Sequence, residues 1–361
     1  MGSTKVIRPA PTRDAGPRPD MRTVLAGVEM PNPVLTASGC AAAGRELQQF
    51  FDVARLGAVV TKSIMAAPRS GRPTPRMAET PSGMLNSIGL QGPGIDAFLD
   101  HDLPWLVERG ARAVVSIAGA SVDEYTELAA RLSDAEGVTA VEVNISCPNV
   151  EDRGQVFACH PEPAAAVVAA ARAQLPARVP VLAKLSPDVT DIVAIARAVV
   201  EAGADGLSMI NTLLGMVIDT QTMRPALAGV TGGLSGPAIR PVAVRCVWQV
   251  HAALPDVPIL GMGGIASGRD ALEFVLAGAS AVSVGTAVFH DPGAPVRVLG
   301  ELERILHARG FGAVKDAVGH AHRPAAEPVT ERRVERPPPA ADTSAEADAP
   351  RVVVFDDSRR R

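Results

Sequence analysis

The segment Gly57-Ala-Val-Val-Thr-Lys62 shows the pattern that decides the fold. In this segment Gly-Ala follows a helical stretch and leads into a short β-branched run. The pattern recurs at Gly110-Ala-Arg-Ala-Val-Val-Ser116, Gly203-Ala-Asp-Gly-Leu-Ser-Met-Ile-Asn211 and Gly278-Ala-Ser-Ala-Val-Ser-Val-Gly285. Glycine suits the left-handed position that closes a helix, and each apolar run is short enough for a buried parallel strand. Each segment therefore predicts the end of a helix followed by a strand.

Four further apolar runs fill the gaps between these segments. They are Pro33-Val-Leu-Thr-Ala37, Ala140-Val-Glu-Val-Asn-Ile145, Val179-Pro-Val-Leu-Ala-Lys184 and Val257-Pro-Ile-Leu-Gly261. Between most strands we expect helices, at residues 45–55, 123–133, 163–174, 190–202, 238–253 and 268–276. Alternating strands and helices with eight strands in all predict an α/β fold of the (β/α)8, or TIM barrel, type. A doubly wound open sheet is the alternative, although no Gly-x-Gly-x-x-Gly follows the first strand.

The composition predicts one large domain between two tails. Hydrophobic residues make up 47% of the 361 residues and aromatic residues only 3%, so the core must consist of Val, Leu, Ile and Ala. We assign this core to a single domain at residues 21–320. Residues 1–20 and 321–361 are rich in Pro, Arg or small polar residues and are predicted to be disordered. No stretch resembles a signal peptide or a membrane span, which predicts a soluble cytoplasmic protein.

Charge and cysteine content narrow the choice of partners. The net charge of −4 gives no reason to expect nucleic acid or an anionic membrane as a partner. Cys40, Cys147, Cys159 and Cys246 are widely spaced and include no Cys-x-x-Cys pair. This spacing predicts free thiols in a reduced compartment and no bound metal.

Polar side chains stand at the ends of the first six predicted strands. In barrels of this type the chemistry takes place at the carboxyl ends of the strands. We therefore expect these side chains to share one site: Ser38, Lys62 with Ser63, Ser116, Asn144, Lys184, and Asn211 with Thr212.

The last two strands end in glycine-rich turns, at Gly261-Met-Gly-Gly264 and at Gly285-Thr286. Loops at these two positions often bind a phosphate through backbone N–H groups, and glycine permits the close approach. The two turns together predict a phosphorylated ligand.

Lys62, Lys184 and Cys147 are the candidate reactive groups. Either lysine could form a Schiff base, or both could stabilise negative charge on a cofactor or substrate. Cys147 follows the end of the fourth strand and precedes Pro148-Asn149, so it lies in a loop with access to a ligand. Its thiol could act as a base, and a small buried apolar role is the alternative.

Ten motifs in order give the chain a family resemblance over about residues 21–315. They are Asn32-Pro-Val, Ala37-Ser-Gly39, Lys62-Ser63, Met84-Leu-Asn-Ser-Ile-Gly-Leu-Gln91, Glu142-Val-Asn-Ile-Ser-Cys-Pro-Asn-Val150, Lys184-Leu-Ser-Pro187, Ile210-Asn-Thr-Leu213, Gly232-Gly-Leu-Ser-Gly-Pro-Ala238, Gly261-Met-Gly-Gly-Ile265 and Val284-Gly-Thr-Ala287. At these residues the chain resembles class 1 dihydroorotate dehydrogenases, and most closely the catalytic subunit of class 1B.

The resemblance implies FMN as cofactor and dihydroorotate as substrate, which would be oxidised to orotate in pyrimidine (UMP) biosynthesis. The residues that it places at FMN are Ser38, Lys62, Ser63, Ser116, Asn144, Lys184, Ile210, Gly236, Gly263, Gly264, Gly285 and Thr286. The residues that it places at the substrate are Lys62, Asn86, Ser87, Ile88, Gly89, Leu90, Asn144, Asn149, Asn211 and Thr212.

The same resemblance assigns Cys147 as the base that removes a proton from C5 of dihydroorotate while a hydride passes from C6 to flavin N5. It also implies a separate subunit with FAD and an iron–sulfur cluster that passes electrons to NAD, in a homodimer or a heterotetramer. One departure lies in the loop after Asn149, where Glu151-Asp-Arg-Gly-Gln155 replaces the lysine and glycine pair expected of class 1B. The resemblance implies that residues 147–160 form a lid that excludes water from the site, and this difference alters the sequence of that lid.

Other functions keep only part of this set. A Schiff-base aldolase would use Lys62 or Lys184 without flavin, and a non-catalytic phosphate-binding barrel would need neither the lysines nor Cys147. A related FMN enzyme acting on another dihydropyrimidine, such as dihydrouracil, would change the residues that face the carboxylate. Dihydroorotate oxidation could also use fumarate or another electron acceptor.

Overall fold

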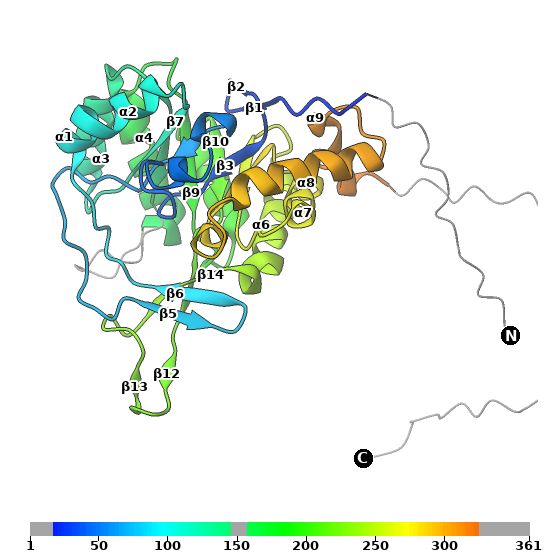
Figure 1. Cartoon of the computed structure of the whole chain (residues 1–361). Coiled ribbons are helices and arrows are strands. Elements are labelled where there is room, and N and C mark those ends of the chain that lie inside the picture. Colours follow the sequence, from blue (N-terminus) through cyan, green and yellow to red (C-terminus); the bar gives the residue numbers. More distant parts are fainter. Residues whose placement is uncertain (1–16, 146–156, 325–361) are drawn as a thin grey trace, which may run out of the picture. The chain divides into compact units, whose positions relative to one another are not determined.

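The computed structural model describes residues 17–145 and 157–324. A closed sheet of eight parallel strands lies at its centre (Figure 1). In chain order the strands are β3 (Val34–Thr36), β4 (Val59–Val60), β7 (Ala113–Ile117), β8 (Val138–Asn144), β9 (Val181–Leu185), β10 (Gly206–Met209), β15 (Ile259–Met262) and β16 (Ala281–Val284). Neighbours pair in the order β3-β16-β15-β10-β9-β8-β7-β4, and a parallel bridge between Leu35 and Ala58 joins the two ends. The predicted (β/α)8 barrel is confirmed.

Successive side chains along each barrel strand point alternately outward and inward, and so belong to two separate hydrophobic clusters. On β8, Val141 and Val143 pack outward in the large cluster that the strands share with the helices. Ala140 instead belongs to a second cluster inside the barrel. Because successive side chains point to opposite faces, Glu142 and Asn144 also face the interior. On the inner face of the barrel, polar side chains therefore lie between the buried apolar cluster and the carboxyl ends of the strands.

A short hairpin seals the other end of the barrel. It consists of β1 (Thr23–Leu25) and β2 (Val28–Met30), which pair antiparallel. Leu25 and Met30 are almost completely buried and pack in the interior cluster with Leu182 of β9 and Leu260 of β15. This plug leaves the carboxyl end of the barrel as the place for a ligand.

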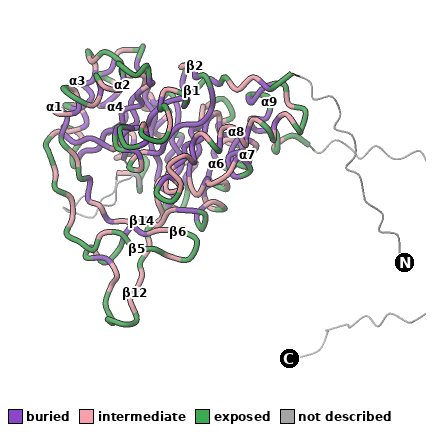
Figure 2. Tube along the Cα trace, viewed as in Figure 1, coloured by how far each residue is buried: buried purple, intermediate pink, exposed green. Residues whose placement is uncertain are grey.

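Helices cover the outside of the barrel, and consecutive helices from α3 to α8 pack against one another. Figure 2 shows the buried strands inside and the more exposed outer surface of the helices. The helices are α1 (Ile95–Ala97), α2 (Leu103–Glu108), α3 (Val122–Ser133), α4 (Pro161–Gln174), α5 (Ile192–Glu201), α6 (Arg240–Ala253), α7 (Gly268–Ala277), α8 (Ala294–Ala308) and α9 (Val314–Ala317). Short helical turns are η1 (Leu47–Gln49), η2 (Val53–Arg55), η3 (Phe98–Asp102), η4 (Phe157–Cys159), η5 (Pro237–Ile239), η6 (Thr286–Phe289) and η7 (His320–His322).

The helix predicted at residues 45–55 is wrong, because this segment forms only the two separate turns η1 and η2. Side chains interrupt the backbone hydrogen bonds between them. The side chain of Gln48 accepts from the N–H of Val53, and the carboxylate of Asp52 accepts from the N–H of Ala54. Since polar side chains compete with the helical i to i−4 bonds, the chain ends one turn and starts another. The other five predicted helices are confirmed within three residues at each end.

A second sheet lies beyond the carboxyl end of the barrel. Its strands are β5 (Met77–Thr80), β6 (Gly83–Asn86), β11 (Leu213–Gly215) and β14 (Gly232–Ser235), in the order β11-β14-β6-β5. This sheet joins the long loop that follows β4 to the long loop that follows β10, with Asn86 opposite Gly233. A hairpin of β12 (Ile218–Asp219) and β13 (Arg224–Pro225) projects from the same region (Figure 1). The sequence pattern did not predict this sheet.

The described part of the chain begins within the predicted N-terminal tail. Asp20 forms a parallel bridge with Ala313, and its N–H donates to the carbonyl of Gly312 at 2.9 Å. Residues 1–16 and 325–361, which hold most of the two predicted tails, lie outside the described residues. No helix found among residues 17–145 and 157–324 has both the length and the apolar character needed to cross a membrane.

Candidate active site

A cavity of about 910 Å³ opens at the carboxyl end of the barrel. This volume lies in the range of sites for cofactors and drug-sized ligands. Its walls come from the loops that follow the barrel strands and from β5, β6 and β14 of the second sheet. The sheet therefore forms part of the wall above the barrel. It places side chains from the first and the second half of the chain around one space.

Most of the sequence-predicted site residues line this cavity. They are Ser38, Lys62, Ser63, Asn86, Ile88, Gly89, Leu90, Asn144, Lys184, Ile210, Asn211, Thr212, Gly236, Gly263, Gly264, Gly285 and Thr286. Ser116 and Ser87 do not line it, and both are fully buried. Ser116 lies 2.9 Å from the hydroxyl of Ser63, and Ser87 accepts from Arg72 at 3.0 Å. Ser116 therefore supports Ser63 of the wall, whereas the side chain of Ser87 bonds to Arg72, which is not one of the residues that line the cavity.

Cys147 and Asn149 lie outside the described residues, which stop at Ile145 and resume at Phe157. The strand that leads to them is described. Asn144 ends β8 in the cavity wall, and its backbone carbonyl accepts a 2.8 Å hydrogen bond from the buried hydroxyl of Tyr125. The end of β8 is therefore fixed from the helix side.

A row of hydroxyl and amide groups crosses the wall of the cavity. The hydroxyl of Ser63 lies 3.2 Å from that of Ser38 and accepts from the side-chain amide of Asn144 at 3.0 Å. The amide of Asn211 donates in turn to the side-chain oxygen of Asn144 at 3.4 Å. Because each group orients the next, the donors and acceptors facing the cavity are held in place before a ligand arrives.

Lys184 brings a positive charge to the buried part of the wall. It is only 4% exposed, and its Nζ lies 3.5 Å from Oε1 of Glu142, which is fully buried inside the barrel. Neither carboxylate oxygen of Glu142 has a hydrogen-bond partner among the described residues. Since water is largely excluded here, the charge of Lys184 acts more strongly than it would at the surface. Lys62 adds a second cation to the same wall.

Cys40 is a cavity residue that the sequence reasoning did not select. Burial raises the pKa of its thiol to about 11, and the positive charges of Lys184 and Lys62 oppose this rise. Cys40 is therefore a neutral thiol at pH 7. Its place directly after Ala37-Ser38-Gly39 at the end of the first strand was the signal that could have identified it.

Three glycines with positive φ surround one part of the cavity. The φ angles are +96° at Gly236, +134° at Gly263 and +75° at Gly264. A Cβ atom at Gly264 would lie 2.5 Å from the carbonyl oxygen of Gly236, so the two backbones approach too closely for any side chain. This close approach requires glycine and leaves the backbone open to a ligand. The three glycines, with Gly285 and Thr286, are called the glycine cradle below.

The glycine cradle offers donors that suit a phosphate. Within the described residues, the backbone N–H groups of Gly263, Gly264 and Thr286 make no hydrogen bond to the protein. The hydroxyl of Thr286 lies 2.8 Å from that of Ser235, a second cavity residue that the sequence reasoning missed. Clustered backbone N–H groups bind anionic oxygens well, so the cradle fits a phosphate group.

Comparison with known proteins then decides the family. A sequence model of the dihydroorotate dehydrogenase family matches residues 20–306. The chain belongs to this family. It is 52% identical over 302 residues to the catalytic subunit of dihydroorotate dehydrogenase B (NAD(+)) from Pelobacter propionicus, covering 84% of this chain and 98% of that protein. The subunits of the same name from Desulforudis audaxviator and Geobacillus kaustophilus are 52% and 49% identical, over 83% and 84% of this chain and 96% of each relative.

The family confirms the resemblance to the class 1B catalytic subunit that the motifs predicted. As a dihydroorotate dehydrogenase the chain is an FMN-dependent oxidoreductase. The cavity fits FMN in three respects: a cradle of N–H groups that have no partner among the described residues, a row of hydroxyl and amide groups, and a buried cation at Lys184. The same features do not favour an aldolase or a non-catalytic barrel, which need neither the family motifs nor the buried ion pair.

Proposed function

We propose that this protein is the catalytic subunit of a class 1B enzyme that oxidises dihydroorotate to orotate in pyrimidine biosynthesis. One observation carries the proposal. The same cavity contains the glycine cradle for a phosphate, a buried cation at Lys184, and amides with a second cation at Lys62. A dihydropyrimidine carboxylate and a phosphorylated flavin together need this combination of groups.

The residues proposed to hold FMN are Ser38, Lys62, Ser63, Ser116, Asn144, Lys184, Ile210, Gly236, Gly263, Gly264, Gly285 and Thr286. The glycine cradle would bind the phosphate through its open N–H groups. Ser116 would act through Ser63, since it does not reach the cavity wall. Lys184 would stabilise negative charge that develops during the reaction. When bound, FMN supplies the two-electron acceptor.

The residues proposed to hold the substrate are Lys62, Asn86, Ser87, Ile88, Gly89, Leu90, Asn144, Asn149, Asn211 and Thr212. Each asparagine offers a donor and an acceptor, which matches the carbonyl and N–H groups of a pyrimidine ring. Ser87 would act by fixing its neighbours, since its hydroxyl is held by Arg72. Lys62 would pair with the carboxylate, and Cys147 would remove the proton from C5.

The absorption spectrum of the purified protein tests this function. After reconstitution with FMN we expect flavin bands in the visible region and bleaching on anaerobic addition of dihydroorotate. Dihydrouracil should bleach the bands much more slowly, because it lacks the carboxylate that Lys62 would contact. Faster bleaching by dihydrouracil would favour another dihydropyrimidine as substrate, and a spectrum without flavin bands would overturn the proposal.

Replacing Lys62 by alanine should weaken binding of orotate roughly tenfold or more, the size expected for a lost charge-assisted hydrogen bond. Binding of uracil, which has no carboxylate, should change far less. Titration of both ligands into the FMN-loaded variant measures the difference. Lys315→Ala, on the exposed surface of α9, is the matched control and should leave both affinities unchanged. Equal losses for orotate and uracil would rule out a contact between Lys62 and the carboxylate.

We also propose that a separate subunit carries electrons away from this chain. The relatives are named as catalytic subunits of an NAD(+) enzyme, which implies another subunit. The four dispersed cysteines of this chain offer no iron–sulfur site, so FAD and an iron–sulfur cluster would belong to the partner. With this partner the assembly would be a heterotetramer, and without it the chain would form a homodimer. We place the protein in the cytoplasm, a compartment that free thiols suit.

Copurification from the native host tests the partner. A second subunit with FAD and iron, together with reduction of NAD by dihydroorotate, is the expected result. Reduction of fumarate by the isolated chain at a comparable rate would instead assign fumarate as the acceptor.

A further inference from the structure

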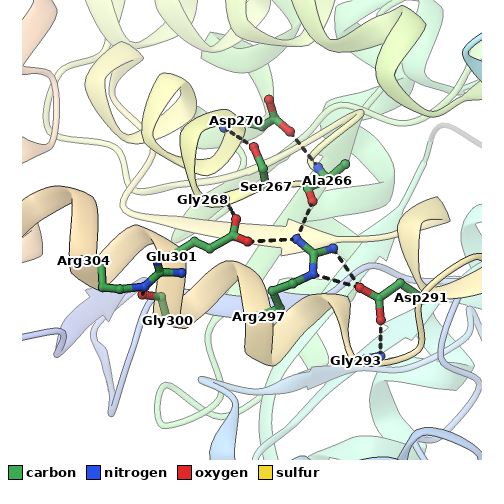
Figure 3. Close-up of polar contacts among 10 residues, drawn as sticks. All are labelled: Ala266, Ser267, Gly268, Asp270, Asp291, Gly293, Arg297, Gly300, Glu301 and Arg304. Carbon is green, nitrogen blue, oxygen red and sulfur yellow. Dashed lines mark hydrogen bonds and ion pairs between the residues drawn. The ribbon is translucent and has the colours of Figure 1, made fainter. Parts of the chain in front are cut away.

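Arg297 joins three segments of the chain on the outer side of the glycine cradle. It lies in the first turns of α8 and also lines the cavity. Its Nε donates to the carboxylate of Asp291 at 2.9 Å, and one terminal nitrogen lies 2.8 Å from the same carboxylate. The other terminal nitrogen donates to the carbonyl of Ala266 at 3.1 Å and to Glu301 at 3.2 Å (Figure 3). One planar guanidinium thus connects α8 to two loops.

The two loops that Arg297 connects carry all the residues of the glycine cradle except Gly236. Ala266 comes two residues after Gly264, in the loop between β15 and α7. Asp291 comes five residues after Thr286, and its second oxygen accepts from the N–H of Gly293. Fixing these two points limits how far the turn with Gly263 and Gly264 and the segment with Gly285 and Thr286 can move apart. A rigid guanidinium fork does this better than a flexible ammonium group.

A second carboxylate fixes the same loop from α8. Glu301 accepts from the N–H of Gly268 at 2.7 Å, at the start of α7 (Figure 3). This bond, with a smaller contribution from Arg297, holds the pKa of Glu301 below its usual value. Asp270 accepts from the N–H of Ala266 at 3.0 Å and pairs with Arg240 at 2.5 Å. Both backbone groups of Ala266 are therefore held, its carbonyl by Arg297 and its N–H by Asp270.

The positive charge of Arg297 has a second effect on the glycine cradle, because it balances two nearby carboxylates. Arg297 contacts the carboxylates of both Asp291 and Glu301. Without the guanidinium, two negative charges would stand near loops that bind a phosphate of the same sign. Their repulsion would weaken anion binding even if the loops kept their positions.

We propose that Arg297 is a positioning residue for the FMN phosphate: it holds the Gly263–Ala266 turn and the segment after Thr286 at the spacing that the phosphate needs. It does so through Ala266 and Asp291, because its nitrogens are already engaged by protein groups. The inference rests on the proposed binding of FMN and adds a residue that the family motifs do not contain.

The test compares FMN with riboflavin, which lacks the phosphate. Both are titrated into the deflavinated full-length protein and followed by quenching of flavin fluorescence. Arg297→Gln should weaken FMN binding about fivefold or more, the effect of losing a partly exposed network of ion pairs. Riboflavin binding should stay as in the unaltered protein, and the melting temperature of the flavin-free protein should fall only slightly, because the lost ion pairs are partly exposed. Arg304→Gln is the matched control, because Arg304 lies on the same helix and its side chain bonds only to the carbonyl of Gly300 among the described residues.

A conservative variant separates position from charge. Arg297→Lys keeps the positive charge but cannot serve three acceptors in one plane, so it should recover only part of the lost FMN affinity. Full affinity in the lysine variant would overturn the positioning role, as would unchanged FMN binding in the glutamine variant. Equal loss of FMN and riboflavin would also overturn it, since the effect would then not concern the phosphate. Failure of the unaltered protein to bind FMN would overturn the proposed function itself.

Discussion

Replacing Gly264 by alanine should weaken FMN binding by about a hundredfold, equal to about 2.7 kcal/mol. Two physical effects combine at this position. The φ angle of +75° is unfavourable for any residue with a Cβ atom, at a cost of about 1–2 kcal/mol. The added Cβ would also lie 2.5 Å from the carbonyl oxygen of Gly236 and 3.0 Å from Cα of Pro237. Both neighbours are backbone atoms, so the two loops must move apart and the cradle must open.

Fluorescence titration of FMN into the deflavinated variant measures this loss. Gly300→Ala is the matched control, because a Cβ atom at Gly300 on α8 meets nothing within 4 Å and needs no positive φ. The control should bind FMN as the unaltered protein does and should be slightly more stable, since alanine favours a helix over glycine. Unchanged FMN affinity in Gly264→Ala would show that the cradle does not hold the phosphate.

Replacing Cys147 by serine should slow reduction of the flavin by dihydroorotate by roughly a hundredfold or more. A positioned base contributes about this much, and a serine hydroxyl loses its proton far less readily than a thiol. Cys147 lies outside the described residues, but in the sequence it comes three positions after Asn144, and Asn144 ends β8 in the cavity wall. Anaerobic stopped-flow measurement of the flavin band gives the reduction rate directly.

Cys159→Ser is the matched control for this experiment. Cys159 lies in η4 at the far end of the same loop, and its side chain is exposed. The control should reduce its flavin at the normal rate, and both variants should bind orotate as tightly as the unaltered protein. A normal reduction rate in Cys147→Ser would remove Cys147 from the mechanism and leave the proton at C5 to another group.

Local pattern identified the barrel and the polar residues at the ends of its strands, because each strand carries its own signal. The run Ala140-Val-Glu-Val-Asn-Ile145 shows it well. Its valines face the helices, and Asn144 turns into the cavity as the alternation predicts. The glycines of the cradle were equally visible, because close backbone approach admits no other residue. The helix at residues 45–55 failed because Gln48 and Asp52 bond to the backbone, a competition that an apolar pattern does not reveal.

The pairing of strands from distant segments could not be predicted from the sequence, for a different reason. The wall above the barrel depends on Asn86 lying opposite Gly233, about 150 residues later in the chain. Nothing near either residue specifies the other. Both Ser63 and Ser116 are serines at strand ends, so residue type could not distinguish them. Only the structure shows that Ser63 lines the cavity and that Ser116, which is hydrogen-bonded to Ser63, does not.

The sequence by itself determined the barrel, the order of the polar residues at its rim and the family, because these follow from periodicity and from short motifs. Only the tertiary structure decided which residues meet across loops. Glu142 faces Lys184 inside the barrel, and Arg297 reaches both Ala266 and Asp291 from α8. Such contacts depend on distances between separate strands and helices, which packing fixes and which no local stretch of sequence contains.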